Sequence, residues 1–155
     1  MTKKKIFFFI IILFFLNQCG FNIDNQKKFE NLIFSKVELV GDKDLKFHFE
    51  NKMNFKKTSL NDIRGFKFTA KILDLSENIV FDSRGIATEE RIVLTIIYEV
   101  SDTNNKIVFE DTIKKDKRIN IGDNTIQNNI IRNTEKKILL DRIIFEIKNN
   151  LRFVL

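Results

Sequence analysis

The sequence of 155 residues contains no proline, five glycines, and only one cysteine and one histidine. A single cysteine excludes an internal disulfide and offers no set of thiol ligands for a metal. The single histidine, His48, has no partner residues at ligand spacing, so we interpret it as a structural or surface residue. With so few glycines, the chain also has no glycine-rich loop of the phosphate-binding type.

Patterns typical of catalytic sites are also missing from the sequence. The Ser-Arg-Gly tripeptide at residues 83–85 lacks the two flanking glycines of a nucleophile elbow. Glu89 and Glu90 are sequence neighbours, so in a strand their side chains face opposite ways and cannot act as an acid/base couple. We therefore expect that this protein is not an enzyme.

The longest apolar run lies at the amino terminus and spans residues 6–16. Its 11 residues are too few for a membrane-spanning helix, which needs roughly 20. Three lysines precede the run and Asn17-Gln18 closes it, which is the layout of a secretory signal over residues 1–18. We expect residues 19–33 to form a tether and residues 34–155 to form one domain.

Cys19 is the first residue after the predicted signal. The stretch Leu16-Asn17-Gln18-Cys19 resembles a bacterial lipobox, which implies diacylglycerol and N-acyl chains on Cys19 and an anchor at the membrane surface. Gly20 follows, rather than the aspartate that signals retention in the inner membrane, so the resemblance implies outer-membrane delivery. An uncleaved signal anchor, or ordinary cleavage that leaves a free cysteine, are the alternatives.

The charge of the chain gives little support for nucleic-acid binding. The leader holds three of the 27 basic residues and none of the 21 acidic ones, so the remainder has a net charge of +3. No basic run alternates with aromatic residues as in a stacking platform, and an exported protein seldom meets nucleic acid. We expect no nucleic-acid partner.

Hydrophobic periodicity predicts an ordered series of strands and helices. After Gly41, Leu45, Phe49 and Met53 share one helical face behind a possible Asp42 or Asp44 cap, although Leu45, Phe47 and Phe49 also alternate as in a strand. We expect the three strands that follow this helix to form an antiparallel meander. The predicted elements are a strand over 35–40, this helix, strands over 66–72, 91–100 and 107–113, and a helix from Asp123 to about Asn150.

The long terminal helix is apolar over most of its circumference between residues 138 and 147. A helix that is apolar all round is normally buried all round, yet one small sheet covers only one side. Ordinary core packing and a contact with another protein or lipid both remain open. The residues we assign to a partner surface are Ile138, Leu139, Ile143 and Phe145.

A basic segment, Lys114-Lys115-Asp116-Lys117-Arg118, follows the last predicted strand, and Arg84 lies in an earlier predicted loop. Such a run is commonly a solvated face. The alternative is an anion site, in which arginine forms bidentate contacts with phosphate and lysine acts as a point charge.

Several short motifs, taken in order, resemble the LptE family of lipopolysaccharide-assembly lipoproteins. The resemblance implies an α+β fold, a two-layer sandwich of a four-stranded sheet with two helices on one face, in the order β-α-β-β-β-α that periodicity also indicates. The motifs are Cys19-Gly20-Phe21, residues 84–91 (RGIATEER) before a strand with Tyr98, residues 101–103 (SDT), residues 118–121 (RINI) and the terminal helix.

The same resemblance implies a function without catalysis or cofactor. The family member plugs and helps to assemble the outer-membrane barrel LptD, one-to-one, and assists lipopolysaccharide insertion into the outer leaflet. Its domain lies on the periplasmic side or inside the barrel lumen. An accessory lipoprotein of another envelope complex (pilotin or barrel-assembly type) and a periplasmic lipid carrier are the alternatives. The lipopolysaccharide-binding candidates, chosen by charge and loop position, are Arg84, Lys115, Lys117 and Arg118.

Overall fold

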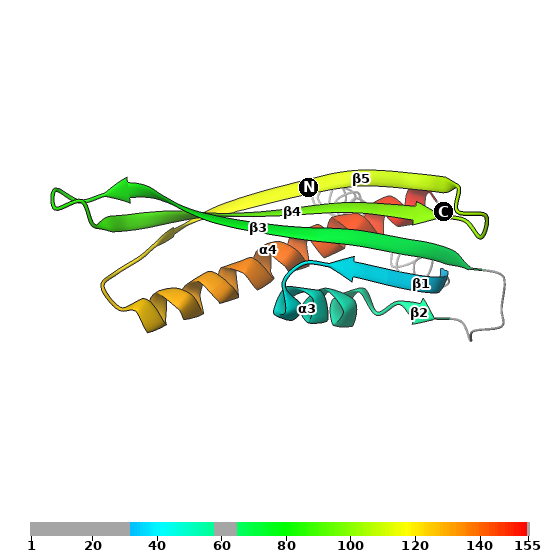
Figure 1. The fold of residues 1–155 in the computed structure, drawn as a ribbon, viewed down its shortest axis with the longest axis horizontal. Coiled ribbons are helices and arrows are strands. Elements are labelled where there is room, and N and C mark those ends of the chain that lie inside the picture. Colours follow the sequence, from blue (N-terminus) through cyan, green and yellow to red (C-terminus); the bar gives the residue numbers. More distant parts are fainter. Residues whose placement is uncertain (1–31, 58–64, 155) are drawn as a thin grey trace, which may run out of the picture.

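The computed structural model describes residues 32–57 and 65–154. Figure 1 shows a long sheet with two helices packed along it. Apart from a two-residue strand, the elements follow the predicted order β-α-β-β-β-α, so the predicted fold class is confirmed. The elements are β1 (Ile33–Val40), α3 (Lys43–Met53), β2 (Lys56–Lys57), β3 (Phe66–Phe81), β4 (Ala87–Ser101), β5 (Ile107–Asn120) and α4 (Thr125–Val154).

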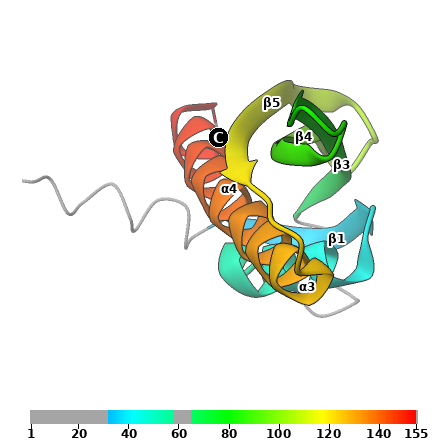
Figure 2. The same cartoon turned by 90° about the vertical axis from the view of Figure 1, so that its left-hand side faces the viewer.

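Within the described ranges the strands form one sheet in the order β2-β1-β3-β4-β5. β1 runs parallel to β3, whereas β3, β4 and β5 are antiparallel neighbours joined by short turns. Because parallel pairing needs a crossover connection, the chain passes through α3 before it returns as β3. Figure 2, turned by 90°, shows a curled sheet with α3 and α4 on the same side of it. This confirms the two-layer arrangement.

Two strands continue well beyond their predicted ends. β3 reaches Phe81 rather than residue 72, and β5 reaches Asn120 rather than residue 113. Both extensions stay paired with β4 along the backbone, while most of their side chains are exposed. Inward positions of the extensions are polar, among them Asp74 and Ser76 of β3 and Lys115 and Lys117 of β5, so hydrophobic alternation does not indicate a strand there. The segment 114–118 therefore lies inside β5, and the prediction that it follows the last strand is wrong.

Each helix begins at a side-chain cap. Asp42 caps α3, because its Oδ1 accepts hydrogen bonds from the backbone N–H groups of Asp44 (2.9 Å) and Leu45 (3.1 Å). For α4 the cap is Asn124 rather than the predicted Asp123, since Asn124 Oδ1 accepts from the N–H of Gln127 at 3.1 Å. The helical interpretation of residues 45–53 is confirmed.

The core lies between the helices and the side of the sheet that they cover. Leu45, Phe49 and Met53 of α3 are buried there, as their spacing predicts. The fully buried residues of α4 lie between 139 and 151, whereas in the first part of the helix Ile131 is partly buried against the core and Ile126 is 74% exposed. Figure 1 shows why: the first half of α4 extends past α3, which covers only the later part. The buried residues of α4 are Leu139, Leu140, Ile143, Ile144, Ile147 and Leu151.

Candidate functional site

The predicted signal, Cys19 and most of the predicted tether lie outside the described residues. Over the described ranges, neither helix combines the length and apolar character that crossing a bilayer requires. Lipidation of Cys19 therefore stays a prediction from the sequence.

The predicted partner surface on α4 divides into two pairs of residues. Leu139 and Ile143 are buried in the core, so their assignment to this surface is wrong. Ile138 and Phe145, one heptad apart on the other side of the helix, are exposed, with Phe145 at 66%. The two pairs occupy different faces of a 3.6-residue helix. We call Ile138 and Phe145 the outer helix face.

A second group of exposed apolar side chains lies on the opposite side of the domain. Ile72 is buried in the core on β3, so Leu73 and Leu75 have the other parity and face away from the helices. Ile97 of β4 pairs with Lys71 on this same face. Leu73, Leu75 and Ile97 are all exposed, and we call them the open sheet face. Both outer surfaces of the sandwich therefore carry uncovered apolar groups.

The four predicted lipopolysaccharide-binding residues do not form one cluster. Arg84 lies in the β3–β4 turn, where its Nε and Nη2 donate to Asp82 Oδ2 at 3.0 and 2.8 Å. Lys115 lies in β5 and donates to Glu146 Oε1 of α4 at 2.6 Å. Both cations are therefore already paired with a carboxylate.

Lys117 and Arg118 are exposed residues of β5 whose side chains face opposite sides of the sheet. Lys117 has the same parity as Lys115, on the side of α4, whereas Arg118 lies directly opposite Arg91 of β4. Within the described part of the chain, neither Lys117 nor Arg118 makes an ion pair. These two cations are therefore the predicted residues with charge available for an anion.

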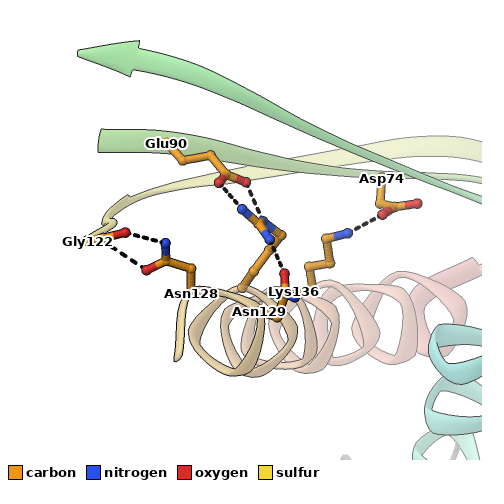
Figure 3. Close-up of polar contacts among 7 residues, drawn as sticks. Asp74, Glu90, Gly122, Asn128, Asn129 and Lys136 are labelled. Atoms are coloured by element: carbon orange, nitrogen blue, oxygen red, sulfur yellow. Dashed lines mark hydrogen bonds and ion pairs between the residues drawn. The ribbon is translucent and has the colours of Figure 1, made fainter. Parts of the chain in front are cut away.

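A polar cluster joins the first half of α4 to the sheet (Figure 3). Glu90 of β4 is 2% exposed and accepts a bidentate hydrogen bond from Arg132, with Nε at 2.7 Å from Oε1. Lys136, one helical turn later, donates to Asp74 of β3. We call Asp74, Glu90, Arg132 and Lys136 the polar clamp. It holds the first half of α4 against the sheet together with the partly buried Ile131.

The electrostatics of Glu90 follow from this geometry. The hydrogen bonds from Arg132 lower the pKa of the Glu90 carboxyl below 4.5, although burial opposes the shift by raising it. The same contact raises the pKa of Arg132. Strand parity correctly separates Glu89 from Glu90, but the buried ion pair of Glu90 was not predicted. The available signal was a glutamate with the same parity as the core residues Ile92 and Leu94.

Two further contacts support α4 from its flanks. Asn128 accepts a hydrogen bond from the N–H of Gly122 (3.0 Å) and donates to the Gly122 carbonyl (2.7 Å), which fixes the chain that enters the helix (Figure 3). His48 Nε2 lies 2.8 Å from Asp141 Oδ1 and thereby links α3 to α4. Among the described residues no three His, Cys, Asp or Glu side chains form a possible metal site. The observed contact of His48 fits a structural role.

Comparison with known proteins finds likeness in structure but not in sequence. No family model matches the chain, and no curated protein matches its sequence. A minor lipoprotein from Acinetobacter baumannii has a similar structure, with a TM-score of 0.56, 13% identity, and coverage of 78% of this chain and 92% of that one. Lipoprotein B from Nitrosomonas europaea, described as uncharacterized, is also similar, with a TM-score of 0.55, 13% identity, and coverage of 78% of this chain and 84% of that one. This chain therefore shares the fold of proteins that are described as bacterial lipoproteins.

Proposed function

We propose that this protein is an outer-membrane lipoprotein of the LptE type, which plugs and helps to assemble the LptD barrel and assists lipopolysaccharide insertion. Acyl chains on Cys19 anchor it, and its domain lies on the periplasmic side or in the barrel lumen. The observation that carries the proposal is the presence of exposed apolar side chains on both outer surfaces of the sandwich. The fold shared with bacterial lipoproteins supports it.

Exposed apolar side chains on both outer surfaces of the domain favour a partner that surrounds it. Contiguous exposed apolar surface commonly marks an interface with protein or lipid, and a flat partner would cover one surface only. The outer helix face and the open sheet face lie on opposite sides of a two-layer domain. A barrel wall that encloses the domain would contact both at once.

The first test is affinity purification of the full-length protein, tagged after Leu155, from detergent-solubilised outer membrane. We expect a large LptD-like barrel at near one-to-one yield. Because apolar contacts on both faces contribute, Phe145→Asp and Leu75→Asp should each lower barrel recovery about tenfold, which corresponds to ~1.4 kcal/mol of binding free energy. Quantitative mass spectrometry of the eluate provides the measurement.

Ile126→Asp serves as the matched control, because Ile126 is also an exposed apolar residue of α4 but belongs to neither face. It should leave barrel recovery unchanged. Recovery of a different envelope complex would favour the accessory-lipoprotein alternative, and recovery of lipid alone would favour a lipid carrier. Either result, or full barrel recovery with both face variants, would overturn the proposal.

Lipopolysaccharide is the second ligand that we propose, with Arg84, Lys115, Lys117 and Arg118 as candidate contacts. Lys117 and Arg118 should contribute most, because Arg84 and Lys115 are already paired with Asp82 and Glu146. Phosphate groups on the glycolipid would pair with these cations.

Reversing both available charges, Lys117→Glu with Arg118→Glu, should weaken lipopolysaccharide binding at least about tenfold. Lys106→Glu, which changes an exposed lysine in the β4–β5 turn, is the control and should bind as the wild type does. Binding can be measured with immobilised protein and labelled lipopolysaccharide. Unchanged affinity after reversal of all four candidates would show that the site lies elsewhere.

A further inference from the structure

The two hairpin turns of the sheet share one backbone structure. In the first turn the N–H of Asp82 donates to the Ile86 carbonyl (2.8 Å) and the N–H of Gly85 to the Asp82 carbonyl (3.0 Å). The second turn repeats both bonds between Asp102 and Lys106 (2.9 Å) and between Asn105 and Asp102 (3.1 Å). The chain thus contains one turn scaffold twice.

The aspartate that opens each turn also binds the backbone in the same way. Asp82 Oδ1 accepts from the N–H groups of Arg84 and Ile86, both at 2.9 Å. Asp102 Oδ1 accepts from the equivalent N–H groups of residues 104 and 106, at 2.8 and 2.9 Å. The fourth residue of each turn has a positive φ, 79° at Gly85 and 60° at Asn105. The two turns therefore differ in their side chains and not in their architecture.

Those side chains differ in polarity at the turn positions themselves, although Ile107 and Val108, which follow the second turn, are also exposed apolar residues. Phe81 of the first turn is 56% exposed, and Ile86 is exposed beside it. The equivalent positions of the second turn hold Ser101 and Lys106. Val80 is also exposed on the first hairpin, next to two irregularities in the pairing of β3 with β4 that break the regular alternation of side chains. The scaffold does not require apolar residues, so their presence at the first turn needs another explanation.

The first turn is suited to a medium that offers no hydrogen bonds. Four internal hydrogen bonds close it, as in the second turn, and in the first turn the Arg84 guanidinium is also paired with Asp82, whereas the second turn has Asn104 at that position. An apolar medium strongly penalises unpaired polar groups, and the N–H groups of residues 82, 84, 85 and 86 and the charge of Arg84 already have partners.

From this combination we propose that the β3–β4 turn inserts Val80, Phe81 and Ile86 into the boundary between headgroups and acyl chains of a lipid bilayer. Figure 1 shows the turn at one end of the molecule, with the β4–β5 turn at the other. Apolar residues at such a boundary typically enter it by about 5–10 Å. The proposal concerns a lipid contact of its own and does not depend on a barrel partner.

The test compares one environment-sensitive label at the two turns. Cys19→Ser removes the single native thiol, and Ser83→Cys or Thr103→Cys then places a nitrobenzoxadiazole label in the first or second turn of the full-length chain. Each protein is mixed with phosphatidylcholine vesicles, with and without bromine on the acyl chains. We expect blue-shifted emission and bromine quenching for the label at residue 83. The label at residue 103 should emit as in water.

Substitution by the residues of the second turn provides the decisive variant. Phe81→Ser with Ile86→Lys, made in the Ser83→Cys protein, should reduce quenching at least about fivefold, because it removes apolar area and adds a charge. Ile107→Lys, at an exposed aliphatic residue beside the other turn, is the matched control and should leave quenching unchanged. The substitutions at residues 81, 83, 86, 103 and 107 change exposed side chains, and circular dichroism checks that all the variants fold.

Three results would overturn the proposal. They are absence of quenching at residue 83, equal quenching at residues 83 and 103, and retained quenching in the double variant. Equal quenching would mean that another part of the chain, such as the apolar leader, brings the whole molecule to the vesicle. Because the vesicles contain no barrel, these results are independent of the barrel purification.

Discussion

Replacing Phe68 by alanine is expected to lower the free energy of unfolding by about 3–5 kcal/mol. Phe68 of β3 is fully buried, and its ring lies 4.9 Å from that of Phe55 and 6.0 Å from that of Tyr98, between centroids. It also contacts Phe34 and Phe49, each at 6.1 Å. The substitution removes the ring that joins β1, α3 and β4 and leaves a cavity that these elements cannot all close. Urea unfolding followed by circular dichroism gives the value.

Two controls separate burial from residue type. Phe68→Leu retains an apolar side chain of moderate size and should destabilise much less than the alanine variant. Phe47→Ala removes an exposed phenylalanine of α3 and should change stability by no more than about 0.5 kcal/mol. If Phe68→Ala and Phe47→Ala had similar effects, the ring cluster would not be the centre of the core.

Arg132→Ala is expected to cost about 3 kcal/mol near neutral pH, because it leaves Glu90 charged and buried without its partner. The reverse change, Glu90→Gln, should cost less, since Arg132 is partly exposed and water can solvate it. Arg142→Ala, at an exposed position of the same helix, is the control. Equal unfolding midpoints for Arg132→Ala and Arg142→Ala would contradict a structural role for the clamp.

The pH dependence of this variant provides a second check with a definite sign. In the wild type the pKa of Glu90 is lowered on folding, so its contribution is present above 4.5 and lost as the pH falls through the lower folded value. Arg132→Ala removes the largest cause that lowers the pKa of Glu90, while burial, which raises it, remains along with the smaller lowering effects of Ser76 and Lys136. The pKa of Glu90 should therefore be higher in the variant than in the wild type. Protonation of Glu90 then relieves the variant, so the difference in unfolding free energy should shrink as the pH falls through the folded pKa of Glu90 in the variant, which lies above that in the wild type. A constant difference would show that Glu90 does not titrate as proposed.

Local sequence pattern was sufficient for the order of the elements. The spacing of Leu45, Phe49 and Met53 places three buried residues on one face of α3. Alternation from Ile92 to Val100 predicts a strand whose inner face is fully apolar, and these residues are buried in β4. In both cases the period of the backbone and the polarity of the side chains agree.

Hydrophobic patterning did not identify the buried residues where two adjacent positions are both apolar. Leu139 and Ile138 are adjacent apolar residues of α4, and only the position of the sheet decides that the first is buried and the second exposed. The predicted end of β5 was wrong for a related reason. Backbone pairing with β4, rather than apolar alternation, maintains the outer half of this strand. Such choices are made by tertiary contacts that no local window contains.

The candidate site was the part least accessible from the sequence. Arg132 and Glu90 are 42 positions apart, so no short motif connects them. Choosing Arg84 and Lys115 by charge alone could not reveal that each is already paired with a carboxylate. Charge can be counted in a sequence, whereas its availability depends on neighbours that folding supplies.

The position of β5 at the margin of the sheet gives its basic segment a second consequence. One side of the β5 backbone pairs with β4, and the other side pairs with no strand of the described ranges. An unpaired strand margin can join the same margin of another copy, and charged side chains oppose that self-association. Neutral substitutions of Lys117 and Arg118 would therefore reduce solubility along with any ligand binding. Reversal to glutamate keeps the margin charged, so it separates a lost ligand contact from aggregation.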